Sequence, residues 1–362
     1  MMIVASQWIS LRQDLHHNMR FLLFPFALIY GWAASFRNHL YDLRIWKSVA
    51  FDINVISVGN LAVGGTGKSP MVEYLVKLLK ENGHKPATLS RGYKRKTRGF
   101  RLAGNNDNAS TLGDEPFQFW LKFKKEIPVA VGEERVMAIP EILYEHEDRD
   151  VVVCDDAFQH RNLRPNFSIL LSTFDNPFFT DYVMPVGNLR EKKNGAERAD
   201  VLIFTKCNEN VETLKISYIQ KAKKYLNAQT PIFFTKIKYQ DPVRVFENEI
   251  VFNSDILLVT GLADSSQILE YVSCTYSLVK HIEYGDHHDY KEGDVDMMKD
   301  AFNTLSQQNE NNISILTTEK DFVKISAIKE LSTFPFFYLP IEIEFLYEGD
   351  KFERLILDSF KD

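Results

Sequence analysis

The sequence predicts an α/β protein built on a doubly wound parallel sheet, with a second, smaller α/β lobe. Between residues 54 and 205, short apolar segments alternate with amphipathic ones, as strands and helices do in parallel sheets. A glycine-rich segment, residues 64–69, directly follows the first apolar segment. The chain has 362 residues, of which 45% are hydrophobic and 25% charged. This length suits about two domains, and the composition excludes a mostly disordered chain.

The N-terminal segment, residues 1–48, predicts a membrane-associating helix. Its apolar run from Phe21 to Phe36 contains no charge and is bracketed by Arg20 and Arg37. As a straight helix the run would be about 24 Å long, shorter than the roughly 30 Å hydrocarbon core of a bilayer. Pro25 is expected to break or kink it near its start. A signal peptide and a buried core helix are alternatives, but the flanking cations and aromatics favour a helix at the membrane surface.

Charge is distributed unevenly along the chain. Residues 1–50 carry a net charge of +3, whereas the whole chain carries −6. A basic head suits an anionic membrane surface, and the acidic remainder argues against a nucleic-acid partner. The three cysteines lie far apart in the sequence. This spacing predicts neither a zinc site nor a disulfide framework, and it favours reduced thiols.

Residues 49–230 predict the core of the protein. Its segments are short and apolar where strands are expected, and residues 150–154 form a continuous apolar run of the kind that is buried on both faces of a parallel sheet. The expected strands are 54–59, 85–90, 150–154, 167–171 and 200–205, and the expected helices are 69–82, 117–125 and 135–147.

The pattern changes after residue 230. Residues 231–250 form the predicted connector strand, and the stretch FFTKIKYQDPVRVF within it alternates polar and apolar side chains, as do residues 341–345. We expect these segments to pair as a two-stranded β connector, with Lys236 and Lys238 opposite Glu342 and Glu344. Residues 251–338 then predict the smaller α/β lobe, and residues 339–362 the return strand and a C-terminal helix. Within the lobe, we expect strands at 256–260 and 313–316 and a helix from Ser266.

The glycine-rich segment reads GGTGKS and predicts a P-loop NTPase core that binds the phosphates of a nucleotide. Backbone N–H groups would face the phosphates, Lys68 would reach the β- and γ-phosphates, and Ser69 would ligate Mg²⁺. Ala62 occupies a position where glycine is usual, so we expect Gly64 and Gly65 to supply the bend. A simple glycine-rich turn before a helix is the alternative. The predicted nucleotide-binding residues are Gly64, Gly65, Thr66, Gly67, Lys68 and Ser69.

Two carboxylates follow the apolar run at 150–154. Asp155 and Asp156 would lie at the carboxyl end of a strand, where P-loop proteins place an acidic residue that holds Mg²⁺. The alternative is a helix N-cap, a position that aspartate often occupies. We predict that both bind the metal ion together with Ser69.

Two further segments carry candidate functional groups. Residues 90–101 contain six cations interleaved with aromatics, which favours an anionic head group or membrane phosphates over nucleic acid or a merely solvated loop. Residues 113–116 read GDEP and place Asp114 and Glu115 in a tight loop. Local sequence alone leaves capping of the following helix by Asp114 as an alternative.

Together these segments resemble the tetraacyldisaccharide 4′-kinase family, the lipid A 4′-kinases of Gram-negative bacteria. The resemblance extends over about 260 residues and keeps the order of the motifs. The similar stretches are SVGNLAVGGTGKSP (57–70), SRGYKRK (90–96), GDEP (113–116), DDAFQHR (155–161), MPVGNLRE (184–191), RADVLIFTK (198–206), GDHHDY (285–290) and TTEKD (317–321).

The resemblance implies an ATP-dependent kinase that phosphorylates the 4′-hydroxyl of a tetraacyldisaccharide 1-phosphate, at the cytoplasmic face of the inner membrane. It implies that Asp114 is the general base, that His287 assists it, and that Lys68 acts on the phosphates. The neighbouring His288 could be confused with His287. Because His287 falls in the predicted smaller lobe, lobe closure is expected to assemble the pair. The residues expected at the substrate are Arg91, Glu115, Arg135, His160 and Glu191.

Two residues depart from the family pattern. Ala157 and Lys94 both stand where glycine is usual. Alanine would be unfavourable at 157 if the backbone there has a positive φ. Neither departure removes a predicted catalytic group. A membrane-associated P-loop ATPase or GTPase that acts as a switch remains the alternative function, and the absence of an Asp after Thr205-Lys206 weakens the GTPase version. A scaffold with an inactive P-loop is disfavoured because Lys68 and Ser69 are intact.

Overall fold

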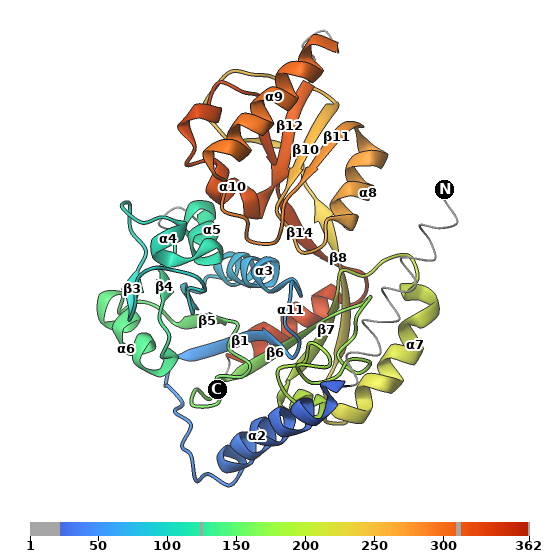
Figure 1. Ribbon diagram of the computed structural model, residues 1–362. Coiled ribbons are helices and arrows are strands. Elements are labelled where there is room, and N and C mark those ends of the chain that lie inside the picture. Colours follow the sequence, from blue (N-terminus) through green and yellow to red (C-terminus); the bar gives the residue numbers. More distant parts are fainter. Residues whose placement is uncertain (1–21, 124–125, 309–312, 361–362) are drawn as a thin grey trace. The chain divides into compact units, whose positions relative to one another are not determined.

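The computed structural model describes residues 22–123, 126–308 and 313–360, and it divides the chain into two compact units (Figure 1). Unit 1 comprises residues 1–84, 150–236 and 345–362, and unit 2 comprises residues 85–149 and 237–344. These units differ from the bounds expected from the sequence, since residues 85–149 group with the C-terminal lobe. The reason is a helix contact within unit 2, where α5 (Asp114–Phe123) packs against α10 (Glu319–Ile325).

Unit 1 contains five parallel strands in the order β8-β7-β6-β1-β5. β5 and β6 are consecutive in the chain but pair with opposite sides of β1, so the winding direction reverses at β1. Ligands of doubly wound sheets bind at such a reversal, beyond the carboxyl ends of the strands. The strands are β1 (Asn54–Asn60), β5 (Val151–Asp155), β6 (Phe167–Thr173), β7 (Val201–Thr205) and β8 (Ile232–Tyr239).

Helices cover both faces of this sheet. α3 (Lys68–Glu81) buries Met71, Leu75 and Leu79, and it contacts β1 and β5. The other face carries an aromatic cluster that includes Phe204, Phe234 and residues of α7 (Val211–Ala222). Among the described residues of unit 1, the other helical elements are α2 (Phe24–Asp42), η1 (Lys193–Arg198), η2 (Lys223–Tyr225) and α11 (Gly349–Asp358).

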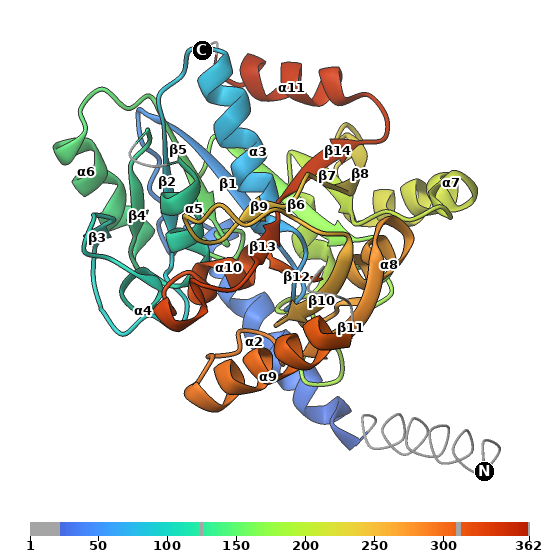
Figure 2. The same cartoon turned by 90° about the horizontal axis from the view of Figure 1, so that it is seen from above.

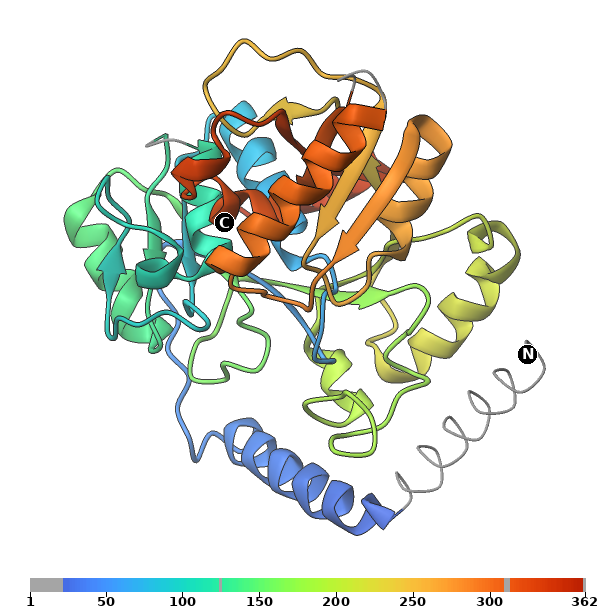
Figure 3. The ribbon, with the colours of Figure 1, turned by 45° about the horizontal axis from the view of Figure 1, so that its top comes forward.

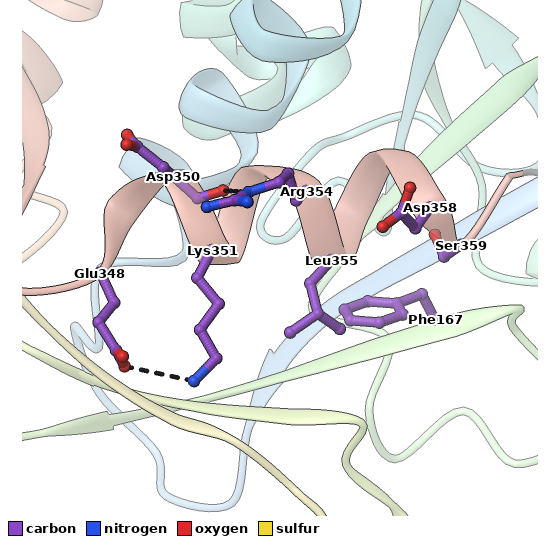
Figure 4. Close-up of a pocket in the computed structure, with 8 residues that line it drawn as sticks. All are labelled: Phe167, Glu348, Asp350, Lys351, Arg354, Leu355, Asp358 and Ser359. Atoms are coloured by element: carbon purple, nitrogen blue, oxygen red, sulfur yellow. Dashed lines mark hydrogen bonds and ion pairs between the residues drawn. The ribbon is translucent and has the colours of Figure 1, made fainter.

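The C-terminal helix α11 lies beside α3 (Figure 2). The Phe352 ring lies 6.1 Å from that of Tyr74, whose hydroxyl donates to Glu353. Residues of α11 and Phe167 at the start of β6 line a groove, in which Leu355 lies against Phe167 (Figure 4). The groove contains none of the site residues that the sequence predicts.

Unit 2 contains a five-stranded sheet in the order β11-β10-β12-β13-β9, with only β9 antiparallel. On β10, Leu257 and Val259 pack in a cluster with α9, whereas Ile256 and Leu258 pack in a cluster with α8, so helices cover both faces (Figure 3). The elements are β9 (Val243–Arg244), β10 (Asp255–Thr260), α8 (Ser266–Thr275), β11 (Ser277–Glu283), α9 (Glu292–Gln308), β12 (Ile313–Thr318), η3 (Lys329–Leu331) and β13 (Phe336–Leu339).

The remainder of unit 2 is a smaller group of strands and helices. β4 pairs in parallel with β2 and antiparallel with β3. Helix α5 begins at Asp114, earlier than the predicted Phe117, because Asp114 and Glu115 supply the acidic first turn that stabilises a helix N-terminus. The elements are β2 (Pro86–Ser90), β3 (Arg101–Leu102), α4 (Ala109–Leu112), β4 (Val129–Val131) and α6 (Arg135–Glu145).

The predicted connector is present in part. β8 and β14 (Ile341–Phe345) are neighbouring strands, and Gln240 Nε2 donates to Glu342 Oε2 at 2.9 Å. Further along the predicted connector strand 231–250, residues 243–244 pair with β13 rather than with β14. The predicted opposition of Lys236 and Lys238 to the glutamates stays a prediction.

Helix α2 exposes most of its large apolar side chains. It packs through small residues, since Ala27 and Gly31 are buried while Phe26, Ile29 and Trp32 are each more than 60% exposed. The helix is therefore not the buried core helix considered as an alternative. It begins at Phe24, so Pro25 lies in the first turn, where no N–H is needed. Residues 1–21 lie outside the described part. Among the described helices, none combines the length and hydropathy needed to cross a membrane.

Candidate active site

The phosphate-binding loop lies at the reversal point of the unit 1 sheet, between β1 and α3. Gly64 and Gly67 have φ values of 123° and 80°, which a residue with a side chain rarely adopts. Gly65, which lies between them, has no positive φ. The loop is closed by a hydrogen bond from Thr66 N to Gly64 O at 3.0 Å. Gly65 is the central residue of this three-residue turn. Gly64 and Gly65 therefore supply a bend although Ala62 replaces the usual glycine, as the sequence predicts, and Gly67 adds a left-handed residue directly before α3.

The loop is braced by the neighbouring strand β7. Thr205 Oγ1 donates to Thr66 O at 2.9 Å, which fixes the peptide before Gly67. Helix α3 begins at Lys68, and its N-cap makes no side-chain hydrogen bond. A helix N-terminus of this kind presents N–H groups and a positive dipole to an anion. The arrangement fits a nucleotide phosphate.

Two carboxylates adjoin this loop, as the sequence predicts. Asp155 ends β5 opposite Val58 of β1 and is 2% exposed. Asp156 has a φ of 49°, and its Oδ1 lies 3.6 Å from Lys68 Nζ. Arg190 NH1 donates to both oxygens of Asp156 at 3.0 Å. Carboxylate oxygens are preferred ligands of Mg²⁺, so the side chains present here fit a magnesium ion.

Unit 2 brings together the other predicted pair. Asp114, the first residue of α5, accepts a hydrogen bond from His287 Nδ1 at 2.9 Å through its Oδ2. His288 faces elsewhere, since its Nε2 lies 2.9 Å from Asp294 and its ring stacks on Tyr284. His287 is therefore the partner of Asp114. Both residues belong to unit 2, so the expectation that lobe closure assembles this pair is wrong.

The surroundings of Asp114 keep it ionised. Burial by itself raises the pKa of this carboxyl, but hydrogen bonds from His287 and Lys324 outweigh burial, so the pKa lies below its ordinary value. Lys324 Nζ lies 2.9 Å from Oδ2 of Asp114. At neutral pH, Asp114 is a hydrogen-bonded carboxylate that can accept a proton.

The predicted basic segment, residues 90–101, lies beside this pair in unit 2. The Tyr93 ring meets the His287 ring edge-on at 6.0 Å. The backbone before this ring lies close to Gly113, where a Cβ would be 3.0 Å from Tyr93 O and φ is 96°. Two of the six cations are held by carboxylates, Arg95 by Glu133 and Arg101 by Asp107. The exposed cations are Arg91, Lys94, Lys96 and Arg98.

The two departures from the family pattern differ in their backbone. Ala157 does not have a positive φ, so alanine is compatible with its position; the left-handed residue is its neighbour Asp156. Lys94, by contrast, has a φ of 60°. The left-handed conformation costs a residue with a Cβ roughly 1–2 kcal/mol. Lys94 therefore stores strain that a glycine would relieve.

We expect Lys94→Gly to be more stable than Lys94→Ala by about 1 kcal/mol. Both substitutions remove the same charge, so their difference reports the backbone conformation alone. Urea unfolding of the two variants measures it. Equal stabilities would show that residue 94 does not hold a left-handed conformation in solution.

Three further residues that the sequence predicts at the substrate, Arg135, Glu115 and His160, differ in burial and in position. Arg135 is 2% exposed, and its NH1 donates to the carbonyl oxygens of Gly132 and Glu133, so it supports the turn from β4 into α6. Glu115 follows Asp114 on α5 and is half-buried. His160 is half-buried in the loop after β5. Contact of these residues with the substrate stays a prediction.

Glu191 is 1% exposed and lies at the centre of a hydrogen-bond network in unit 1. It accepts from Asn38 of α2 at 2.6 Å, from Arg198 at 2.7 Å and from Gln159 at 3.1 Å. Gln159 Nε2 also donates to Asn60 O, at the end of β1. The network ties helix α2 to β1, the strand that leads into the phosphate loop.

Sequence reasoning missed several residues that adjoin the predicted groups. Arg190 and Gln159 lie inside motifs that were quoted, but neither was assigned a role. Lys206 Nζ lies 3.8 Å from where a Cβ on Gly65 would be. Lys324 contacts Asp114 and lies outside every quoted motif. Its position three residues after Asp321, on helix α10, which begins inside TTEKD, is the sequence signal that could have indicated it.

Comparisons with known proteins agree with these features. The family model described as LpxK, tetraacyldisaccharide-1-P 4′-kinase, matches residues 19–361. A tetraacyldisaccharide 4′-kinase of Flavobacterium johnsoniae is 40% identical over 348 residues, covering 95% of this chain and 98% of the relative. One of Bacteroides thetaiotaomicron is 39% identical over 354 residues, covering 92% of each.

A solved structure resembles the whole fold. The crystal structure of LpxK from Aquifex aeolicus, in complex with ATP, matches with a TM-score of 0.74 and 28% identity, covering 94% of this chain and 99% of that one. The match confirms the predicted α/β fold class. The family model and the relatives cover nearly all of the chain, including both units and every quoted motif. The chain therefore belongs to the tetraacyldisaccharide 4′-kinase family, whose members are phosphotransferases.

Proposed function

We propose that this chain transfers the γ-phosphate of ATP to the 4′-hydroxyl of a tetraacyldisaccharide 1-phosphate and so forms the 4′-phosphorylated lipid A precursor. The observation that carries the proposal is the 2.9 Å contact between His287 and Asp114, in a chain that also holds an intact P-loop. A nucleotide switch needs the P-loop but has no use for a carboxylate–histidine pair. Membership of the family supports the same activity.

The nucleotide side of the reaction falls to unit 1. The N–H groups between Gly64 and Ser69 cradle the phosphates, and Lys68 neutralises charge on the transferred group. Ser69 Oγ, Asp155 and Asp156 would hold Mg²⁺. When bound, the ion would neutralise phosphate charge. Arg190 keeps Asp156 oriented through its hydrogen bonds.

The acceptor side falls to unit 2. As the 4′-oxygen forms its bond to the γ-phosphorus, the bond from that phosphorus to the bridging oxygen of ADP breaks, and ADP keeps the electron pair. The hydroxyl proton passes to the carboxylate of Asp114, and His287 orients that carboxylate. In-line transfer of this kind is accelerated mainly by positioning and electrostatics.

The substrate is an anionic lipid, and two surfaces suit it. The exposed cations Arg91, Lys94, Lys96 and Arg98 lie in the same unit as Asp114, and they would attract the 1-phosphate. The exposed apolar side of α2 would insert among lipid headgroups while the acyl chains of the substrate remain in the bilayer. We place the protein at the cytoplasmic face of the inner membrane, where ATP is available.

The proposal is tested by supplying the purified protein with γ-labelled ATP, Mg²⁺ and tetraacyldisaccharide 1-phosphate in mixed micelles. A lipid kinase moves the label into the lipid. Label released only as inorganic phosphate, at a rate independent of the lipid, would instead support the membrane-associated ATPase switch and overturn the proposal. Omitting the lipid controls for hydrolysis.

A further inference from the structure

Lys324, the penultimate residue of α10, joins the two segments that carry the acceptor pair. Its Nζ lies 2.9 Å from Asp114 Oδ2 and donates to the carbonyl oxygen of His288 at 2.9 Å. One ammonium group thus contacts both the first turn of α5 and the loop that presents His287. Its side chain is only 17% exposed, so water screens these contacts weakly.

A second ion pair joins the opposite ends of α5 and α10 and provides a comparison for the Lys324 contact. Lys122, near the end of α5, lies 2.6 Å from Glu319 at the start of α10. Glu319 also accepts from the backbone N–H of Ile341. This pair joins α5 to α10 at the end of α5 opposite to Asp114. Lys324 also joins α10 to α5, but its partner is the carboxylate of Asp114.

The contact of Lys324 with the His288 carbonyl also concerns the backbone conformation of His287. His287 has a φ of 57°, a left-handed conformation that costs roughly 1–2 kcal/mol and persists only where the surroundings enforce it. The peptide carbonyl of His288, which directly follows, is the one that Lys324 binds. The lysine therefore holds the strained loop in the conformation that points His287 at Asp114.

Both partners contact the same oxygen of Asp114. His287 Nδ1 and Lys324 Nζ each lie 2.9 Å from Oδ2. A carboxylate held at one oxygen by two partners keeps a defined orientation toward a hydroxyl. Rotation of the carboxylate would break both contacts at once.

We propose that Lys324 is a positioning residue of the phosphoryl-acceptor site: it holds the Asp114 carboxylate and the His287 loop together so that the carboxylate is oriented to receive the hydroxyl proton. This inference rests on the proposed function and adds a residue to it. A misplacement of about 1 Å at a reacting group can cost roughly 10²-fold in rate. Loss of Lys324 is therefore expected to lower kcat about 10–10²-fold without weakening nucleotide binding.

The same contact has a pH signature. The charged groups facing Asp114 are His287 and Lys324, and behind His287 lie Asp286 and its partner Lys320. Removing the Lys324 ammonium takes away a hydrogen bond and a positive charge that favour the ionised carboxylate, so the pKa of Asp114 rises. Because the base must be ionised, the acid limb of the kcat–pH profile moves to higher pH.

The experiment compares Lys324→Met, Lys324→Arg and Lys299→Met with the unmodified protein in the lipid kinase assay. Lys299 pairs with Glu330 at 3.0 Å on the surface of unit 2, away from Asp114, and serves as a matched control. We expect Lys324→Met to lose kcat, to keep the KM for ATP within about threefold and to shift the acid limb upward. Lys324→Arg should recover part of kcat, and Lys299→Met should change neither quantity.

A kcat for Lys324→Met within threefold of the unmodified protein, or a loss with no shift of the acid limb, would overturn the positioning role. Circular dichroism shows whether the variant folds. If it does not, Lys324→Gln keeps an N–H donor for the His288 carbonyl and is expected to show the same acid-limb shift. Failure of the unmodified protein to phosphorylate the lipid would refute the proposed function instead, so the two failures are distinguishable.

Discussion

Replacing Asp114 with asparagine is expected to lower kcat for lipid phosphorylation by about 10²–10⁴-fold, the range that a general base contributes. The amide keeps the shape of the side chain but cannot take the hydroxyl proton. The affinity for ATP should not change, because the phosphate loop and its partners belong to unit 1 and Asp114 to unit 2. Steady-state kinetics with both substrates and equilibrium binding of ATP measure the two quantities.

The matched control for this substitution is Asp148→Asn. Asp148 also belongs to unit 2, but it is exposed and pairs with Arg149 and Lys85, so its loss should leave kcat unchanged. A kcat for Asp114→Asn within threefold of the unmodified protein, a difference of about 0.7 kcal/mol, would show that Asp114 is not the base.

Replacing Phe26, Ile29 and Trp32 of α2 with serine is expected to release the protein from membranes. Each side chain is more than 60% exposed, and burying an apolar side chain of this size gains roughly 1.5–3 kcal/mol. Since insertion at the interface buries them only in part, we expect a loss of about 3–6 kcal/mol, or a fall of roughly 10²–10⁴-fold in the partition coefficient. Cosedimentation with vesicles of anionic phospholipid measures this coefficient.

The control for α2 is the double substitution Leu214→Ser and Ile216→Ser on α7. These residues are also exposed and apolar and lie in unit 1, so they test whether any exposed apolar residue promotes binding. The control should cosediment like the unmodified protein. Equal binding of the α2 variant and the unmodified protein would mean that the described part of α2 is not the membrane contact.

The parts of the site that local sequence could predict are those whose chemistry depends on consecutive residues. A phosphate loop needs glycines, a lysine and a hydroxyl in one turn, so residues 64–69 identify it directly. Asp155 follows from the apolar run that ends in it. The strands of the core were predictable for the same reason, because each is a short, continuous apolar segment.

Other parts depend on tertiary packing and leave no local signal. A lysine at position 324 has the same sequence signature as any solvated lysine on a short helix, and only the packing of α10 on α5 gives it a role. The choice between His287 and His288 depends on a left-handed backbone that adjacent identical residues do not reveal. The assignment of residues 85–149 to unit 2 likewise follows from helix packing, which sequence order does not predict.

Backbone strain at a replaced glycine is also difficult to predict from sequence. The family pattern raised the same concern at Ala157 and at Lys94, since both replace glycine. Only Lys94 proved to have a positive φ. A change from glycine indicates strain only when the backbone conformation at that position is known.

A double-mutant cycle on kcat tests most directly whether Asp114 and His287 act as one unit in proton transfer. The variants are Asp114→Asn, His287→Gln and the double substitution, assayed with ATP and the lipid. Residues that act together are strongly non-additive. The account predicts that the double variant is about as slow as the slower single variant. Effects that instead multiply would show that the two residues contribute independently and would contradict it.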